Sequence, residues 1–181
     1  MAYFLGLGEQ FPYFEKKAVV SIEAGKEFAL MSNNFSNDGG QWTVFFWWPK
    51  DFSGLCPTEL VEFNNAYSEF VSRNATVIGA STDSDVVHLA WRTQHPMLKD
   101  LSYPLLADTS KSLATELGIL MGDDQIAYRA TYNIDADNVI RWLSVNDLPV
   151  GRNVEEVLRV LDALQTKKAC PANWKKGDAT L

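Results

Sequence analysis

The chain has 181 residues, of which 46% are hydrophobic and 22% charged, and its formal net charge is −7 at pH 7. This length fits one domain with room for a tail, and the composition is ordinary for a globular protein. Because nucleic acid and anionic membranes attract basic surfaces, neither is expected as the main partner. No apolar run approaches the roughly 20 residues of a membrane span. Met1–Leu7 lacks the basic region of a signal peptide, so the expected compartment is the cytoplasm.

The first half of the chain predicts a parallel βαβ unit. Gln41–Trp48 is a continuous apolar and aromatic run, typical of a strand buried on both faces, and Pro49 ends it. Thr58–Arg73 is expected to form a helix, because apolar residues recur there at spacings of three and four. Thr76–Ser81 indicates a second buried strand. The helix-sized crossover between the two strands predicts that they pair in parallel.

The second half predicts further helices, a short strand and a hairpin. Asp83 or Ser84 can cap the next helix, and Asn153 can cap the last one. Asp135–Asn138 is rich in turn-forming residues, so the strands on either side should pair as a hairpin. The expected elements are a helix over Asp83–Gln94, a strand over Leu105–Ala107, a helix over Ser110–Leu117, strands over Arg129–Ile134 and Val139–Val145, and a helix over Val154–Gln165.

This order of elements predicts an α/β, thioredoxin-like fold with N-terminal additions and a C-terminal arm. After Lys168 the composition turns polar, with Pro, Gly and Lys. We therefore expect one domain over residues 1–168 and an extended arm, rather than core, over residues 169–181.

The two cysteines, Cys56 and Cys170, are candidates for chemistry. A structural disulfide is not expected in a cytosolic protein, because cellular reductants keep thiols reduced. There is no CxxC, and His88 and His95 are the only imidazoles, so no metal site is expected. No nucleotide or flavin motif is present either, so no cofactor is expected. Two alternatives remain: buried inert thiols or redox-active ones.

Cys56 is the stronger candidate because of its position. Pro57 suits the first turn of a helix, so Cys56 should lie at the helix N-terminus, where free backbone N–H groups and the helix dipole stabilise a thiolate. Ser53, three residues upstream, offers a hydroxyl that can both donate and accept. Glu59, one turn into the helix, can orient a cationic partner. A position after a proline-terminated strand is also a poor place for core packing, which favours a functional thiol.

The run Pro49-x-x-x-Ser53-x-x-Cys56 resembles the PxxxT/SxxC active-site motif of peroxiredoxins. The longer string Phe46–Glu59 is similar to the typical two-cysteine group, the AhpC/Prx1 subfamily, which includes the AhpC component of alkyl hydroperoxide reductase. The motif alone is moderately specific, but further segments resemble that group in order and at family spacing from about residue 8 to residue 181. These segments are Ser81–Ser84, His88–Trp91, Tyr128–Asp135, Asn146–Arg152 and Cys170–Trp174.

The resemblance implies a role for each candidate site residue. Cys56 would be the peroxidatic cysteine, and Cys170 the resolving cysteine, supplied by the partner subunit of an antiparallel homodimer. Arg129 would stabilise the thiolate and the peroxide oxygens. The other roles are shielding by Pro49, hydrogen bonding of the peroxide by Ser53, and a supporting polar network of Glu59 and Arg152.

The implied activity is a thiol-dependent peroxidase that reduces hydrogen peroxide and organic hydroperoxides. A Cys56 sulfenic acid would be resolved by Cys170 as an intersubunit disulfide and recycled by a thioredoxin-like or AhpF/AhpD-type reductase. The dimers of such enzymes can form decamers. Two alternatives are a thioredoxin-like protein thiol oxidoreductase, disfavoured by the missing CxxC, and an oligomeric holdase chaperone.

One departure from the family pattern precedes Cys56. Gly54-Leu55 stands where many members have Phe-Val. Because glycine is the most flexible residue, this pair should loosen the segment and speed disulfide formation.

Overall fold

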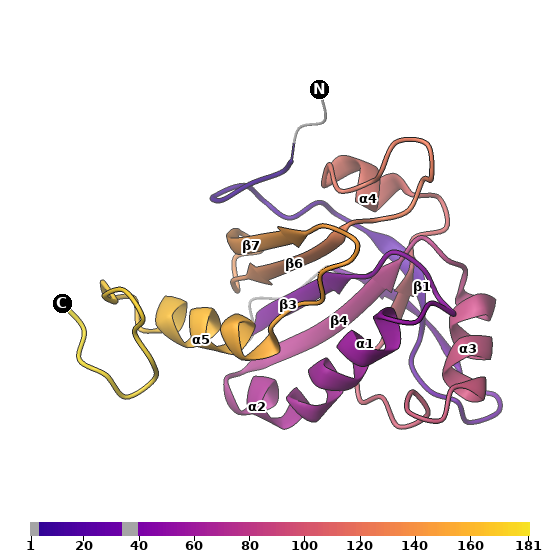
Figure 1. Ribbon diagram of the computed structural model, residues 1–181, viewed down its shortest axis with the longest axis horizontal. Helices are drawn as coiled ribbons and strands as arrows, with labels where there is room; N and C mark the ends of the chain where they lie inside the picture. The colour runs from indigo at the N-terminus through magenta and orange to yellow at the C-terminus, as the bar shows by residue number, and fades with distance from the viewer. Residues whose placement is uncertain (1–3, 34–39) are drawn as a thin grey trace.

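The computed structural model describes residues 4–33 and 40–181 (Figure 1). Residues 1–3, part of the segment expected to lack signal-peptide character, and residues 34–39, within the predicted domain, lie outside the described residues. In the described part, seven strands form one sheet in the order β2-β1-β5-β4-β3-β6-β7. They are β1 (Glu15–Val19), β2 (Phe28–Ser32), β3 (Trp42–Trp47), β4 (Ala75–Ser81), β5 (Leu105–Ala107), β6 (Arg129–Ile134) and β7 (Ile140–Asn146).

The predicted βαβ unit and hairpin are both present, which confirms the α/β class. β3 pairs in parallel with β4 over its whole length. β6 and β7 pair antiparallel. Asp135 closes their turn, because its Oδ1 accepts hydrogen bonds from the backbone N–H groups of Asp137 and Val139 at 2.9 and 3.0 Å. This is the turn chemistry expected from the sequence.

The helices of the described residues are α1 (Cys56–Asn65), α2 (Tyr67–Ser72), α3 (Asp85–Gln94), α4 (Ser112–Glu116) and α5 (Val154–Gln165). The Ser84 and Asn153 side chains cap α3 and α5, as predicted. None of these helices has the length and apolar character needed to cross a membrane.

The single helix predicted over Thr58–Arg73 is wrong. The chain becomes helical two residues earlier, at Cys56, and is divided at Ala66, whose φ and ψ are −89° and 2°. Apolar residues keep a helical spacing across the break, and alanine is a good helix former. The sequence therefore carries no local signal for the division.

The N-terminal additions include two strands that the sequence analysis did not identify. β1 pairs antiparallel with both β2 and β5. Only Ala18 and Val19 of β1 are fully buried, so the strand lacks the alternation of apolar and polar residues that identifies a half-buried strand. Its position depends on pairing with distant strands rather than on its own pattern.

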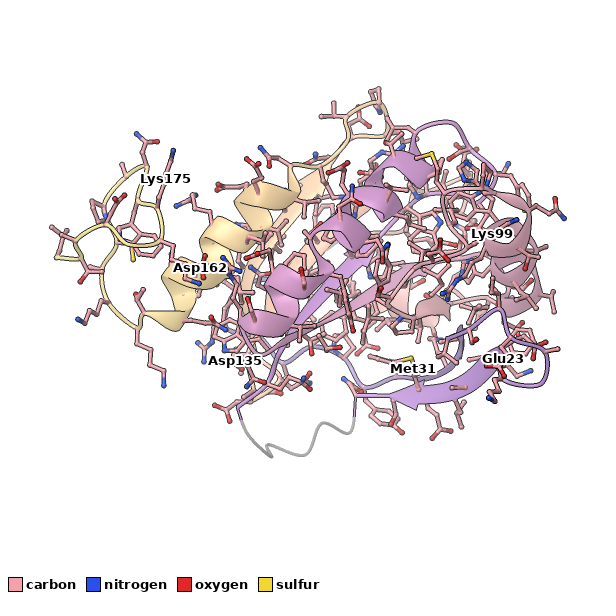
Figure 2. All side chains as sticks on the ribbon, turned by 90° about the horizontal axis from the view of Figure 1, so that it is seen from below. Glu23, Met31, Lys99, Asp135, Asp162 and Lys175 are labelled. Carbon is pink, nitrogen blue, oxygen red and sulfur yellow. The ribbon has the colours of Figure 1, made fainter. Side chains whose placement is uncertain are left out.

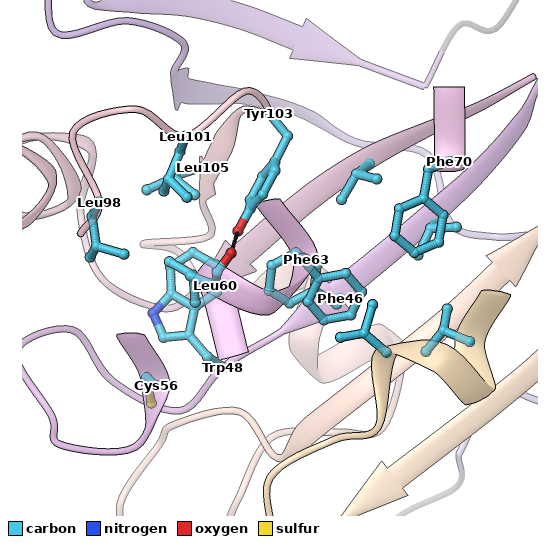
Figure 3. Packing of buried hydrophobic residues seen from close by; sticks show 14 of the residues in the cluster. Phe46, Trp48, Cys56, Leu60, Phe63, Phe70, Leu98, Leu101, Tyr103 and Leu105 are labelled. Carbon is cyan, nitrogen blue, oxygen red and sulfur yellow. Dashed lines mark hydrogen bonds between the residues drawn. The ribbon is translucent and has the colours of Figure 1, made fainter. Parts of the chain in front are cut away.

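The core lies on both faces of β3, and this fixes the strand end that leads to Cys56. Val44, Phe46 and Trp48 pack with side chains from α1, α2, α3 and α5, whereas Phe45 and Trp47 pack with the N-terminal segment and α4. Figure 3 shows the first of these clusters with Cys56 near Trp48.

A glycine on the adjacent strand makes room for two of these rings. A Cβ on Gly79 of β4 would lie 2.9 Å from ring atoms of both Phe46 and Trp48. No ordinary side chain fits there, so the close packing of β3 against β4 depends on this glycine.

The C-terminal arm, residues 169–181, lies beyond the end of α5 and contains no helix or strand (Figure 1). It is a closed loop rather than the extended segment expected, because the Leu181 N–H donates to the Ala169 carbonyl at 2.9 Å. Trp174, only 4% exposed, anchors the loop, and its carbonyl accepts a hydrogen bond from Arg159 Nη1 of α5 at 3.1 Å. Figure 2 shows Lys175 of the arm beyond Asp162 of α5, at the end of the molecule opposite Lys99.

Candidate active site

Cys56 is the first residue of α1, directly after the segment that leaves β3, and Pro57 lies in the first turn as predicted. The Cys56 side chain is only 1% exposed and belongs to the core cluster. The expectation that this position is unsuited to core packing is therefore wrong. Pro49, Asp51 and Pro57 are buried as well, so several residues around this helix end lie in the interior.

Arg129 places a guanidinium beside the Cys56 sulfur. It lies at the start of β6, the neighbour of β3, and is 5% exposed. Its Nη1 donates to Cys56 Sγ at 3.3 Å and to Glu59 Oε2 at 2.6 Å, and its Nε donates to the Leu148 carbonyl at 2.7 Å. Three acceptors, two on α1 and one on the segment after β7, thus hold the guanidinium in one orientation.

Glu59 connects Arg129 to a second buried guanidinium. Its Oε1 accepts from the Nε and the backbone N–H of Arg152 at 2.8 and 3.1 Å. Arg152 Nη1 donates to the carbonyls of Trp47 and Ala130, at 2.7 and 3.1 Å. Burial lowers the pKa of Arg152, and the neighbouring Glu59 carboxylate opposes that shift.

The three charged side chains leave an excess of positive charge at the sulfur. Two guanidiniums face one carboxylate, and each of these side chains is at most 6% exposed. With little water to screen it, this excess of positive charge attracts an anion at the site.

Ser53 presents a buried hydroxyl on the segment before Cys56. Within the part of the chain that the structure describes, its Oγ has no hydrogen-bond partner. The hydroxyl is thus free to donate to, or accept from, a reacting oxygen. A hollow of about 260 Å³ opens at Ser53; it is lined by Phe52, Ser53, Trp91, Gln94, His95 and Pro96.

Cys170 lies apart from the other predicted site residues. It is half-buried in the arm, with its Sγ 3.5 Å from Thr166 Oγ1 and 3.8 Å from the Ala163 carbonyl. Arg152, in contact with Glu59, precedes α5, whereas Cys170 follows it. An α-helix of the 12 residues of α5 is about 18 Å long. The network that contains Cys56 therefore reaches the N-terminal end of α5, whereas Cys170 lies beyond its C-terminal end.

Cys56, Glu59, Arg129 and Arg152 are thus in direct contact, with Ser53 and Pro49 on the adjoining segment. The sequence analysis missed one contact of this site, the Leu148 carbonyl that holds Arg129. A backbone acceptor leaves no side-chain signal. It also did not single out Asp51, although a buried carboxylate is an unusual feature.

The chain is similar to known proteins in sequence and in fold. The chain matches the sequence model of the AhpC/TSA family over residues 7–143, and that of the C-terminal domain of 1-Cys peroxiredoxin over residues 163–181. It is 43% identical to alkyl hydroperoxide reductase C of Mycolicibacterium smegmatis, covering 98% of this chain and 93% of that protein. It is 41% identical to peroxiredoxin-2 of Mus musculus, covering 97% of this chain and 89% of that protein. The fold is similar to that of reduced 2-Cys peroxiredoxin from Plasmodium vivax, with a TM-score of 0.88, 31% identity, and coverage of 96% of this chain and 91% of that one.

Proposed function

The chain belongs to the AhpC/TSA family and is a thiol-dependent peroxidase with a thioredoxin-like fold, and from this premise we propose that Cys56 is its peroxidatic cysteine and Cys170 its resolving cysteine. The observation that carries the proposal is the Arg129 guanidinium 3.3 Å from the Cys56 sulfur, within a buried network that has one more cation than anions. The oxidoreductase thus has a cysteine with a guanidinium beside its sulfur, and three residues earlier in the chain a hydroxyl without a hydrogen-bond partner among the described residues.

In the first step the Cys56 thiolate attacks the terminal oxygen of a hydroperoxide. An S–O bond forms, the O–O bond breaks, and the electron pair leaves on the other oxygen, which takes a proton to give water or an alcohol. Cys56 becomes a sulfenic acid. We assign charge stabilisation of the leaving oxygen to Arg129 and hydrogen bonding of the peroxide to Ser53. Pro49 shields the site, while Glu59 and Arg152 keep Arg129 in place.

In the second step the Cys170 thiol displaces water from the sulfenic acid and forms a disulfide with Cys56. A disulfide needs Cα atoms about 4.4–6.8 Å apart. The position of the two cysteines at opposite ends of α5 favours Cys170 of a partner subunit over Cys170 of the same chain. Because Cys56 is 1% exposed, its segment and the arm must both open locally for this step.

The remaining features of the proposal concern substrates and partners. We infer that organic hydroperoxides are substrates, as the name of the mycobacterial relative indicates for that protein, and that hydrogen peroxide is a substrate as well. The minimal active unit is a homodimer that assembles into a decamer in the cytoplasm. Residues 169–181 serve as an arm distinct from the domain over residues 1–168. A thioredoxin-like or AhpF/AhpD-type dithiol reductase returns the disulfide to two thiols.

Two experiments test the cysteine roles. Stopped-flow tryptophan fluorescence with hydrogen peroxide should show a fast change in the wild type and none in Cys56→Ser, and peroxide consumption at the wild-type rate by Cys56→Ser would refute the proposal. Separately, Cys56→Ser and Cys170→Ser chains carrying tags of different size can be co-expressed and oxidised. Non-reducing electrophoresis should then show a disulfide-linked heterodimer, whereas an intrachain disulfide would give none.

A further inference from the structure

A second buried polar cluster includes Asp51, two residues before Ser53, and the peroxidase chemistry described above does not use it. Asp51 and His88 are its centre, and their side chains are 1% and 0% exposed. His88 Nδ1 lies 2.7 Å from Asp51 Oδ2, and His88 Nε2 lies 3.2 Å from the Leu106 carbonyl. Asp51 Oδ1 accepts from Trp48 Nε1 at 2.7 Å. The cluster therefore joins the segment after β3 to α3 and β5.

The proton positions in this cluster follow from its acceptors. A carbonyl can only accept, so His88 Nε2 carries a proton that it donates to Leu106. The contact between His88 Nδ1 and Asp51 Oδ2 then holds one proton, either on the imidazole or on the carboxyl. In both arrangements the pair has no net charge and all of its polar atoms are bonded, which suits a site without water. Burial also raises the pKa of Asp51, while the hydrogen bond from His88 opposes the shift.

Asp51 holds the segment through its backbone as well. Its N–H donates to Asp83 Oδ2 at 2.9 Å, and the same oxygen accepts from Ser81 Oγ at 2.9 Å. The next residue, Phe52, has a φ of +55°, which ordinary side chains adopt only when their surroundings impose it. Ser53 follows at once. The fixed end of the segment is thus two residues from the hydroxyl and five from the reactive sulfur.

We propose that Asp51 and His88 are positioning residues of the peroxidase: they hold the Ser53 segment in the conformation that binds peroxide, and their contact must break before Cys56 can reach Cys170. The inference rests on the proposed role of Cys56. The two buried polar groups then have different tasks. Arg129 and its network stabilise charge, and Asp51 with His88 fixes the position of the Ser53 hydroxyl.

The test compares two variants of nearly equal shape. Asp51→Asn can keep every bond of the cluster, with the amide oxygen accepting from Trp48 and the amide N–H donating to neutral His88. Asp51→Leu removes both side-chain bonds of Asp51, to Trp48 and to His88. Both are made in the Cys170→Ser background, where Cys56 is the only thiol and tryptophan fluorescence reports peroxide attack alone. Cys56→Ser serves as the control that tests the premise by itself.

We expect Asp51→Leu to slow Cys56 oxidation about 10- to 100-fold, because a displacement near 1 Å has that cost. Asp51→Asn should restore the rate to within a few-fold of the parent. In a Ser53→Ala background the further effect of Asp51→Leu should largely disappear, because Asp51 acts through Ser53. Alkylation of Cys56 by iodoacetamide, which needs no hydroxyl, should change less than the peroxide rate.

With Cys170 present, Asp51→Leu should also form the disulfide faster after oxidation. Because Asp51→Leu removes buried hydrogen bonds, Asp83→Ala provides a second variant at a half-buried position; it should shift both rates in the same direction but less. Asp85→Ala, in the first turn of α3 and paired with Lys17, is the matched control and should shift neither. An unchanged oxidation rate in Asp51→Leu and Asp83→Ala would overturn the inference, as would equal losses in the Leu and Asn variants. If only Cys56→Ser behaves unexpectedly, the proposed function fails instead.

Discussion

The two cysteines lie in opposite kinds of environment. Cys56 is 1% exposed, starts a helix, and has a guanidinium 3.3 Å from its sulfur. Cys170 lies in a loop with neither helix nor strand, and its sulfur is 3.5–3.8 Å from neutral oxygens. Ion pairs between separate parts of the fold organise the first environment, whereas the second is attached to α5 chiefly through Trp174 and its neighbours.

This difference matches the different physical requirements of the two proposed steps, peroxide attack and disulfide formation. Attack on peroxide needs a fixed cation and fixed donors before the substrate arrives, and the buried network holds the Arg129 guanidinium 3.3 Å from the Cys56 sulfur. Disulfide formation needs a Cys170 thiol that can move toward Cys56, and the arm, a small loop held by a few contacts, can open at a low cost in free energy. If the two environments serve separate steps, a substitution near one cysteine should leave the chemistry of the other cysteine unchanged.

The largest effect is expected for Glu59→Gln. The change leaves the guanidiniums of Arg129 and Arg152 buried without their shared carboxylate. Removing one member of a buried ionic group costs about 3–5 kcal/mol. Urea unfolding should show this loss. Glu62→Gln, on the same helix but at its exposed surface, is the control and should stay within about 0.5 kcal/mol of wild type. A similarly small change for Glu59→Gln would mean that the network is not a structural unit.

The next largest effect is expected for Arg129→Met. Loss of one donor aimed at developing charge lowers rates about 10²- to 10³-fold, so Cys56 oxidation by hydrogen peroxide should slow by this amount. Arg129→Lys should be intermediate, because it keeps the charge but not the forked geometry that reaches Glu59 and Leu148. Stopped-flow fluorescence measures the rate. Arg141→Met on β7 should have no effect, and Cys170 alkylation should be unchanged in all three variants.

The sequence alone predicted those features of the fold that depend on local patterns of residues. The strand before Cys56, the helix cap at Asn153 and the hairpin turn at Asp135 each depend on neighbouring residues and are confirmed. The family resemblance of three separate segments also identified Glu59, Arg129 and Arg152, which the structure brings into contact. Their individual roles remain predictions.

The features that sequence did not predict depend on distant parts of the chain. β1 becomes a strand through pairing with β2 and β5. Cys56 is buried in a core cluster whose other members come from distant parts of the chain. The pairing of Asp51 with His88, 37 positions apart in sequence, is likewise set by the fold. No local spacing encodes these contacts, because they exist only once the sheet has assembled.

A smaller effect, confined to the Cys170 region, is expected for Trp174→Ala. Trp174 is the buried anchor of the arm, and its Nε1 donates to the Asp178 carbonyl at 3.1 Å. A loss of about 1–2 kcal/mol of local stability raises the open population about 5- to 30-fold. Iodoacetamide should therefore label Cys170 faster by about that factor in a Cys56→Ser background. Lys175→Ala, exposed on the same loop, should label at the parent rate, and the Cys56 oxidation rate of Trp174→Ala should equal that of wild type.

The smallest expected effect tests the glycine ahead of Cys56. Gly54 does not have a positive φ, and a Cβ built on it meets nothing within 4 Å. Alanine therefore fits the folded segment and mainly restricts the open one, which should stabilise the closed conformation by about 0.4–1 kcal/mol. Because disulfide formation requires opening, Gly54→Ala should slow that step about two- to fivefold while leaving peroxide attack unchanged. Resolved fluorescence phases separate the two steps. An equal slowing of both steps would show that Gly54 is needed for the folded, reactive conformation of Cys56 rather than for the opening of its segment. The glycine would then be part of the rigid environment of Cys56, and the expectation that Gly54-Leu55 speeds disulfide formation would be wrong.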